Sequence, residues 1–299
     1  MKLVTMVGAL LILGGCQSIE RVETTAASSA AAWQTWRAEE NAAWSLDEFA
    51  ILKIDDAVYL GDKQSAWLTT RKPKIQEHVW TLDARGAPSG VRVTYNAPNA
   101  IVTYQGRTEV FTLEETRRFA VSHGIDVRFQ LAQMTPGVNG LRVMVYNQKH
   151  PLARDFQGLD HFPYSSDAVA DAVFERAKSV EGVDFQTSRG WFKRFYKMGD
   201  AVFTLGGIVV RLPMYSDASD PAKVSSLSAF FLDKLSGKET YGVGRYIDID
   251  VNGLPDRLMI DFNRAYNPNC ARSPHYNCPL ATDTIPVELR AGEKTPSKH

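Results

Sequence analysis

The chain has 299 residues, of which 44% are hydrophobic and 23% are charged, and its 34 basic residues balance its 34 acidic ones. These values are ordinary for a globular protein, and a chain of this length can bury one large core or two smaller ones. The charge balance argues against a nucleic-acid partner, because proteins that bind nucleic acids usually carry a basic excess.

The N-terminus resembles the signal peptide of a bacterial lipoprotein. Lys2 precedes an almost continuously apolar run at residues 3–13, which is shorter than the roughly 20 residues that a membrane-spanning helix needs. The run ends in the letters LGGC, similar to a lipobox, in which small residues precede a cysteine that receives lipid. We expect residues 1–15 to be removed and residues 16–29 to form a tether lipidated on Cys16. An ordinary secretory signal with an incidental cysteine is the alternative.

Lipid on Cys16 would place the chain in the bacterial cell envelope, with the membrane as its partner. Several acyl chains, each contributing about 0.8 kcal/mol per buried CH₂, give stable anchoring. In enterobacterial lipoproteins an aspartate after the cysteine tends to mean retention in the inner membrane. Gln17 stands at that position here and favours the outer membrane, with the protein facing the periplasm.

Residues 30–48 are predicted to form an N-terminal helix. The segment is rich in alanine, and Trp33, Trp36 and Trp44 can form an apolar stripe along it. We expect this stripe to dock on the following domain rather than to bind a ligand.

From about residue 50 the hydrophobic period falls toward two, which is typical of β-strands. Strands are predicted at residues 91–95, 100–104, 109–113, 125–131, 141–146, 167–178, 191–198, 201–205, 208–212, 226–232, 245–251, 257–262 and 285–290. The segment 167–178 is ambiguous, because its alanines also favour a helix. Many short strands separated by turns predict a mainly β fold, an antiparallel sandwich or barrel-like domain. We expect a single large β domain at residues 50–294, followed by a tail at 295–299.

One pair of these strands can be aligned from the sequence. An Asn-Gly dipeptide at residues 252–253 predicts a hairpin turn between strands 245–251 and 257–262. One register places the aliphatic side chains of both strands on a single face, whereas a slip by one residue mixes the faces. This register puts Arg245 on the apolar side, and a strand that ran on would carry Arg264 there as well.

The segment that follows, residues 263–283, is predicted to be a long loop. Three prolines deny it regular structure, and a long ordered loop in a compact domain often carries function. We assign a site for a small polar or anionic ligand to Arg245, Asp261, Asn263, Arg264, Tyr266 and Asn267.

The two arginines of this site need partners, because a buried unpaired charge costs several kcal/mol. Internal acids such as Asp233, Glu239 or Glu293 could supply them in a purely structural network. The alternative partner is an anionic ligand, since a carboxylate or a phosphate matches the guanidinium fork.

Cys270 and Cys278 are predicted to form a disulfide that pins this loop, because an exported protein meets an oxidising compartment. Their spacing with His275 would also permit three metal ligands, with His150 or His161 as a distant fourth. Free thiols are the third alternative. We favour the disulfide and expect neither a metal nor a cofactor.

The familiar catalytic signatures are absent from the sequence: a G-x-S-x-G elbow, H-E-x-x-H, G-x-x-x-x-G-K, and G-x-G-x-x-G after a strand. Our leading hypothesis is therefore a non-catalytic envelope protein that binds a small ligand or a partner at the 261–278 loop. The alternative is a hydrolase that uses Asp261 as base, with Arg245 and Arg264 stabilising charge. A purely structural envelope lipoprotein is the third hypothesis.

The C-terminal half contains DFNRAYNP at residues 261–268, followed by CA at 270–271 and CP at 278–279. These blocks resemble the signature of an uncharacterised family, domain of unknown function 1684. The sequence AGEK at 291–294 is similar to the closing block of the family, and the whole resemblance spans about residues 35–294. Asn269 and residues 280–282 depart from the pattern, where the family commonly has prolines. The family carries no established activity, so the resemblance implies a fold and the location of a site but no chemistry.

Overall fold

The computed structural model describes residues 29–72, 77–84, 90–113, 117–122 and 124–296. The predicted signal peptide and the lipidated Cys16 lie outside these residues. Within the described part of the chain, no helix is both long enough and apolar enough to cross a membrane.

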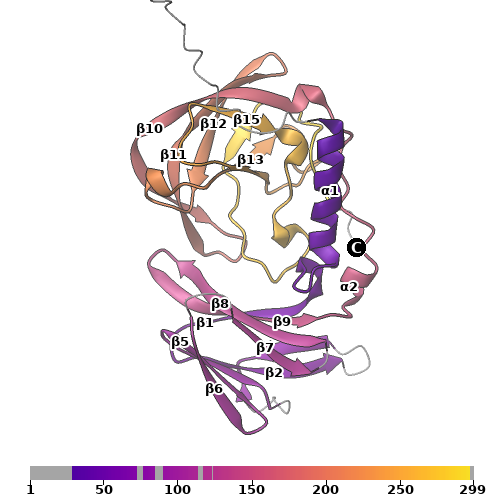
Figure 1. The fold of residues 1–299 in the computed structure, drawn as a ribbon, viewed down its shortest axis with the longest axis vertical. Coiled ribbons are helices and arrows are strands. Elements are labelled where there is room, and N and C mark those ends of the chain that lie inside the picture. Colours follow the sequence, from indigo (N-terminus) through magenta and orange to yellow (C-terminus); the bar gives the residue numbers. More distant parts are fainter. Residues whose placement is uncertain (1–28, 73–76, 85–89, 114–116, 123, 297–299) are drawn as a thin grey trace, which may run out of the picture.

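The predicted N-terminal helix is present as α1 (Ala30–Ser45). Ser29 begins it as an N-cap, because its side chain accepts a hydrogen bond from the amide of Ala32. The helix lies along one side of the C-terminal sheet and leads down to the N-terminal sheets (Figure 1). Trp33 and Trp44 are buried, so the tryptophan stripe does form a docking face, as predicted.

Two antiparallel sheets form the N-terminal part of the described chain. The first has the order β1-β9-β8-β7, and the second has the order β3-β2-β4-β5-β6. The strands of the first are β1 (Ile54–Leu60), β7 (Arg117–Ser122), β8 (Ile125–Thr135) and β9 (Val138–Asn147). Those of the second are β2 (Ser65–Lys72), β3 (Glu77–Thr81), β4 (Arg92–Asn96), β5 (Asn99–Tyr104) and β6 (Arg107–Thr112). Because one apolar cluster contains residues of both sheets, such as Leu68 and Val143, they pack as a sandwich.

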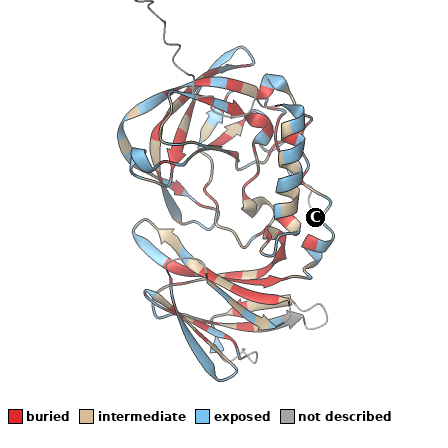
Figure 2. Ribbon diagram, viewed as in Figure 1, coloured by how far each residue is buried: buried red, intermediate tan, exposed pale blue. Residues whose placement is uncertain are grey.

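A seven-stranded antiparallel sheet forms the C-terminal part, in the order β14-β13-β12-β11-β10-β15, with β16 added in parallel to β13. Its strands are β10 (Val169–Gln186), β11 (Phe192–Leu205), β12 (Ile208–Ser216), β13 (Ser226–Asp233), β14 (Arg245–Asp250), β15 (Arg257–Asp261) and β16 (Asp283–Ile285). It curls into a nearly closed barrel around a second apolar cluster. Buried residues lie mainly along the strands of both parts, and hairpin tips are exposed (Figure 2). The prediction of a mainly β fold, an antiparallel sandwich or barrel-like domain with an N-terminal helix, is therefore confirmed.

Short helices connect these strands. They are η1 (Ile51–Lys53), α2 (Pro151–Arg154), η3 (Ser166–Ala168), η4 (Pro221–Lys223), η5 (Phe262–Arg264) and η6 (Asn269–Ala271). The last two lie within the predicted 263–283 loop or at its start, and the rest of that loop is irregular up to β16.

The observed strands differ in several places from those predicted. The ambiguous segment 167–178 is a strand, the start of β10. The strands predicted at 191–198 and 201–205 are one continuous strand, β11. The strand predicted at 285–290 is wrong, because β16 ends at Ile285. The sequence patterns also missed β1, β2, β3 and β7.

The hairpin predicted between residues 245–251 and 257–262 is wrong. β14 pairs with β13, and β15 pairs with β10, so the two strands lie at opposite ends of the sheet order. Their inward faces were nevertheless predicted correctly, since Ile247, Leu258 and Ile260 are all buried in one cluster. Alternation along a strand fixes which side chains face the core, but it does not select the neighbouring strand.

Candidate functional site

Arg245, the first residue of β14, lies in the core with a side chain only 1% exposed. Its Nη2 is 3.0 Å from a carboxylate oxygen of Asp233 and donates to the carbonyl of Leu289 at 3.1 Å. Its Nη1 donates to the carbonyls of Ala291 and Glu293. Arg245 therefore holds the 289–293 segment against the sheet. For Arg245, the internal network with Asp233 is the correct one of the two alternatives that the sequence allowed.

Arg264 is in different surroundings from Arg245. The strand ends at Asp261, whose carboxylate caps η5 by accepting the amide of Asn263. This turn leaves the side chain of Arg264 43% exposed, with Nε 3.7 Å from Asp261 and the guanidinium carbon 5.8 Å from the ring centre of Trp36. The expectation that both arginines face one side is thus wrong, because η5 interrupts the strand alternation.

The remaining predicted site residues hold the loop together. Asn263 exchanges two hydrogen bonds with the backbone of Ser165, at 2.8 and 2.9 Å. The hydroxyl of Tyr266 donates to Asp248. Asn267 donates from its side chain to the carbonyl of Lys294 at 2.7 Å, while its side-chain oxygen is buried with no hydrogen-bond partner.

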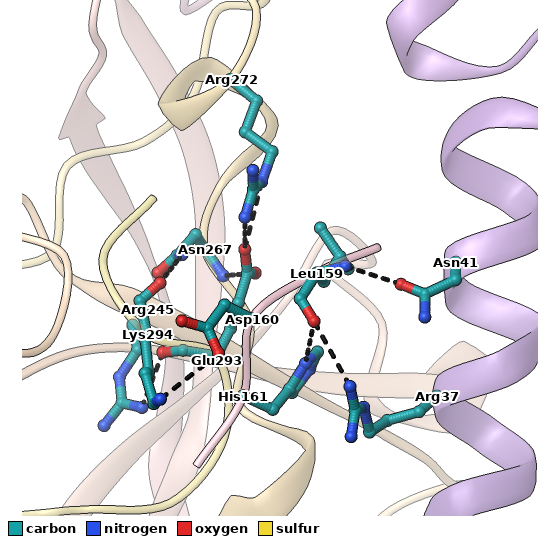
Figure 3. Close-up of polar contacts among 10 residues, drawn as sticks. All are labelled: Arg37, Asn41, Leu159, Asp160, His161, Arg245, Asn267, Arg272, Glu293 and Lys294. Atoms are coloured by element: carbon teal, nitrogen blue, oxygen red, sulfur yellow. Dashed lines mark hydrogen bonds and ion pairs between the residues drawn. The ribbon is translucent and has the colours of Figure 1, made fainter. Parts of the chain in front are cut away.

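A buried acid that the sequence named only as a partner for arginine, Glu293, connects this loop to its surroundings (Figure 3). One carboxylate oxygen accepts hydrogen bonds from Nε and Nη2 of Arg272, at 3.3 and 3.0 Å. The other accepts the amide of Asn267 at 2.8 Å. Burial raises the pKa of Glu293, and the bonds from Asn267 and Arg272 oppose that rise. Arg272 was not among the predicted site residues, although it lies inside the predicted loop.

His161 is a second buried titratable group close to this network (Figure 3). Its Nδ1 lies 3.2 Å from the carbonyl of Leu159, which can only accept, so Nδ1 carries the proton and Nε2 is a buried acceptor with no partner. The rings of Trp33 and Trp36 meet it edge-on at 6.2 and 5.8 Å. Burial lowers the pKa of His161 to about 4, so the ring is neutral near pH 7.

A cavity of about 340 Å³ opens where the loop meets the segment after α2. Leu52, Pro151, Leu152 and Phe156 provide its apolar lining. The charged residues at its wall are Asp155, Asp160 and Arg272. The predicted loop therefore does line a cavity, but through Arg272 and not through Arg245 or Arg264.

The charges around this cavity are arranged unequally. The side chains of Asp155 and Asp160 are 62% and 60% exposed, and each is paired with a neighbouring base, Arg154 and Lys294. The side chain of Arg272 is only 10% exposed, and its guanidinium carbon lies 5.8 Å from the ring centre of Trp44. The two acids are therefore exposed to solvent, whereas the side chain of Arg272 is mostly buried.

The disulfide predicted between Cys270 and Cys278 is not supported, because both cysteines are free thiols and are not at bonding distance. The Cys278 sulfur instead accepts a hydrogen bond from the amide of Cys270 at 3.3 Å. The neighbouring Cys278 thiol lowers the pKa of Cys270.

The alternative of a metal site with Cys270, Cys278 and His275 does not match the geometry. Nδ1 of His275 lies 3.3 Å from Asp56, and Nε2 of His150 lies 3.6 Å from Asp55. In the described ranges no three His, Cys, Asp or Glu side chains converge closely enough to hold a metal ion.

Comparison with known proteins adds a family but no activity. The search of curated proteins finds no match. The chain is similar to the solution NMR structure of an uncharacterized protein from Haloarcula marismortui, with 32% sequence identity, 50% of this chain and 83% of that chain covered, and a TM-score of 0.42. Residues 154–294, which include the 261–278 loop, Arg272 and Glu293, match the family described as "Protein of unknown function (DUF1684)". Through these residues the chain belongs to that family.

Proposed function

We propose that this protein binds a small anionic amphiphile, a molecule with an apolar body and one carboxylate or phosphate group. The observation that carries the proposal is the cavity of about 340 Å³ with apolar walls and a mostly buried arginine, Arg272. Pockets for small ligands are commonly apolar, with few polar groups that fix the orientation of the ligand.

The partner of Arg272 explains why an anion is favoured over a cation. Nε and Nη2 of Arg272 are both directed to one oxygen of Glu293, so Nη1 lies outside this pair. A ligand carboxylate or phosphate inside the cavity would receive a charge-assisted hydrogen bond.

A thermal-shift series tests the proposal with ligands that share one chain length. Octanoate and octyl phosphate should raise the melting temperature, whereas octanol and octyltrimethylammonium should not. A ligand at 100 times its Kd stabilises the folded state by about 2.7 kcal/mol. Equal shifts with octanol and octanoate would show an apolar site without charge selection, and no shift with any of the four would refute the cavity as a binding site.

Two substitutions separate the charge from the apolar walls. Arg272→Lys should weaken octanoate binding, because lysine cannot reproduce the geometry of the guanidinium. Leu152→Asp should abolish it, because Leu152 lines the cavity and is 49% exposed, so the change places a charge there without opening the core. The matched control is Val209→Asp, at an apolar residue that is 71% exposed and lies outside the cavity lining. Binding that survives Leu152→Asp would place the ligand elsewhere.

We also propose that the chain acts at a membrane of the bacterial envelope, held by lipid on Cys16. The apolar run at residues 3–13 and the LGGC sequence that ends it support this proposal. Cys16→Ser should release the protein from the membrane fraction. Continued sedimentation of this variant with membranes, together with no palmitate incorporation by the wild type, would contradict it.

A further inference from the structure

The 261–278 loop, called the family loop below, carries two free thiols that lie in the C-terminal part of the protein. Cys270 is half-buried and Cys278 is buried. The amide of Cys270 donates to the sulfur of Cys278 at 3.3 Å, and both cysteines pack in the same hydrophobic cluster. Neither thiol belongs to the lining of the cavity with Arg272.

The β10–β11 turn holds this pair in place. The amide of Ser188 donates to the carbonyl of Cys278 at 2.9 Å, and the hydroxyl of Ser188 accepts the amide of Cys278 at 3.2 Å. These two bonds fix the backbone of one cysteine against the sheet, so the pair is pre-organised.

The surroundings of the pair are aromatic, with one basic side chain. Cys278 shares a buried cluster with Phe185, Phe230 and Tyr246. The ammonium of Lys193 lies 4.9 Å from the ring centre of Phe195, a residue of the same cluster. An aromatic shell of this kind disfavours hard, strongly hydrated cations, while the lysine can offset negative charge on sulfur.

We propose that Cys270 and Cys278 form a two-thiolate site for a soft monovalent cation, Cu⁺. Thiolates select soft ions, and Cu⁺ is stable with two sulfur ligands. Binding would release both thiol protons and form two sulfur–copper bonds with no change of oxidation state. The resulting complex carries one negative charge, which Lys193 offsets. A Zn²⁺ ion needs about four ligands, and the described residues bring no third His, Cys, Asp or Glu into a cluster that could supply them.

The test is a competition for Cu⁺ under anaerobic, reducing conditions. The full chain is titrated against the coloured complex of Cu⁺ with bathocuproine disulfonate. We expect one Cu⁺ per chain, and a loss of affinity of at least about 100-fold in Cys270→Ser and in Cys278→Ser, beyond the range for residues outside the ligand set. Native mass spectrometry with Ag⁺, which has no redox chemistry here, should show the same stoichiometry.

A matched control and a second variant keep the outcome decisive. His275→Ala changes the same loop but should leave Cu⁺ binding intact, because that ring lies against Asp56. Lys193→Met keeps both thiols and should lower the affinity by about 10-fold, which tests the site even if a serine variant fails to fold. Cu⁺ binding that survives either folded serine variant, that needs His275, that is unchanged by Lys193→Met, or that Zn²⁺ displaces would overturn the proposal.

Discussion

Arginine side chains from one region of the sequence lie in different surroundings, and their surroundings decide their roles. The side chains of Arg245, Arg264 and Arg272 are 1%, 43% and 10% exposed. A guanidinium removed from water must be paired internally, whereas an exposed one gains little from its ion pair. Arg245 is therefore assigned to stability, whereas Arg272, which is also paired internally but lies at a cavity wall, is the arginine of the proposed ligand site.

Removing the buried guanidinium should be costly. We expect Arg245→Met to lower the free energy of unfolding by about 3–5 kcal/mol, because it leaves the Asp233 carboxylate buried without its partner. Arg257→Met is the control, since Arg257 and Asp171 form an exposed pair whose loss should cost far less than that of the buried pair. Urea denaturation measures both, and similar losses in the two variants would contradict the structural role of Arg245.

His161 should make stability depend on pH. Burial lowers the pKa of the folded state from 6.5 to about 4, so between these values the unfolded chain binds a proton that the folded chain does not. This contribution to stability is complete above pH 6.5 and is lost as the pH falls toward 4. The loss should amount to about 3 kcal/mol.

The measurement is the free energy of unfolding of wild type and of His161→Gln across this pH range. The difference between the two proteins should change in favour of the variant as the pH falls. Parallel curves would show that His161 does not remain neutral in the folded protein.

Among the secondary-structure elements, the helix α1 docks on residues 154–294, the region that matches the family. The indole of Trp33 donates to the carbonyl of Asn263 at 2.9 Å, across 230 positions of sequence. The side chain of Asn41 accepts the amide of Leu159 at 2.8 Å, and Trp44 packs in a cluster with Leu52. The helix therefore supports one wall of the cavity, because Trp44 packs against Leu52 and Leu52 lines the cavity.

Trp33→Phe should destabilise the docked helix by about 1–3 kcal/mol, because it removes the indole N–H and leaves the buried carbonyl of Asn263 without this hydrogen bond. Trp36→Phe is the matched control: Trp36 is only partly buried, and a phenyl ring can keep the contact with Arg264. Hydrogen exchange of α1 reports the effect directly. Equal exchange rates in the two variants would show that the indole hydrogen bond does not secure the helix.

At the scale of the whole molecule, the family loop also touches the N-terminal sandwich. Nη2 of Arg142, on β9, donates to the carbonyl of His275 at 3.0 Å, and its guanidinium carbon lies 4.6 Å from the ring centre of Tyr276. The rings of Tyr59 and Trp191 meet edge-on at 4.9 Å between the same two parts. The loop that carries Arg272 is thus held by both halves of the protein.

Arg142→Ala should loosen this connection. We expect faster hydrogen exchange at residues 273–277 and a lower melting temperature, because the variant loses both the hydrogen bond to His275 and the contact with Tyr276. Arg107→Ala, at an exposed residue of the sandwich, should change neither quantity. If the loop exchanges at the wild-type rate in Arg142→Ala, other contacts hold the two parts together.

The local features of this protein could be predicted from the amino-acid sequence. Alternation of apolar residues gave most strands from residue 91 onward, and the inward faces of β14 and β15 were correct, because alternation is a property of a single strand. The N-terminal helix and the irregular loop after β15 were also predicted, since alanine, tryptophan spacing and prolines act within a few residues. Family membership followed from the same loop.

The neighbours of each segment could not be predicted from the sequence and became known from the fold. β14 and β15 pair with β13 and β10 instead of each other, and no local pattern encodes that choice, because the same alternating face fits any apolar partner. The turn η5 leaves Arg264 exposed, and Arg245 is paired with Asp233 in the core. The arginine that lines the cavity is Arg272. Burial, which depends on the whole fold, gave Arg272 its place at the cavity wall and gave His161 its lowered pKa.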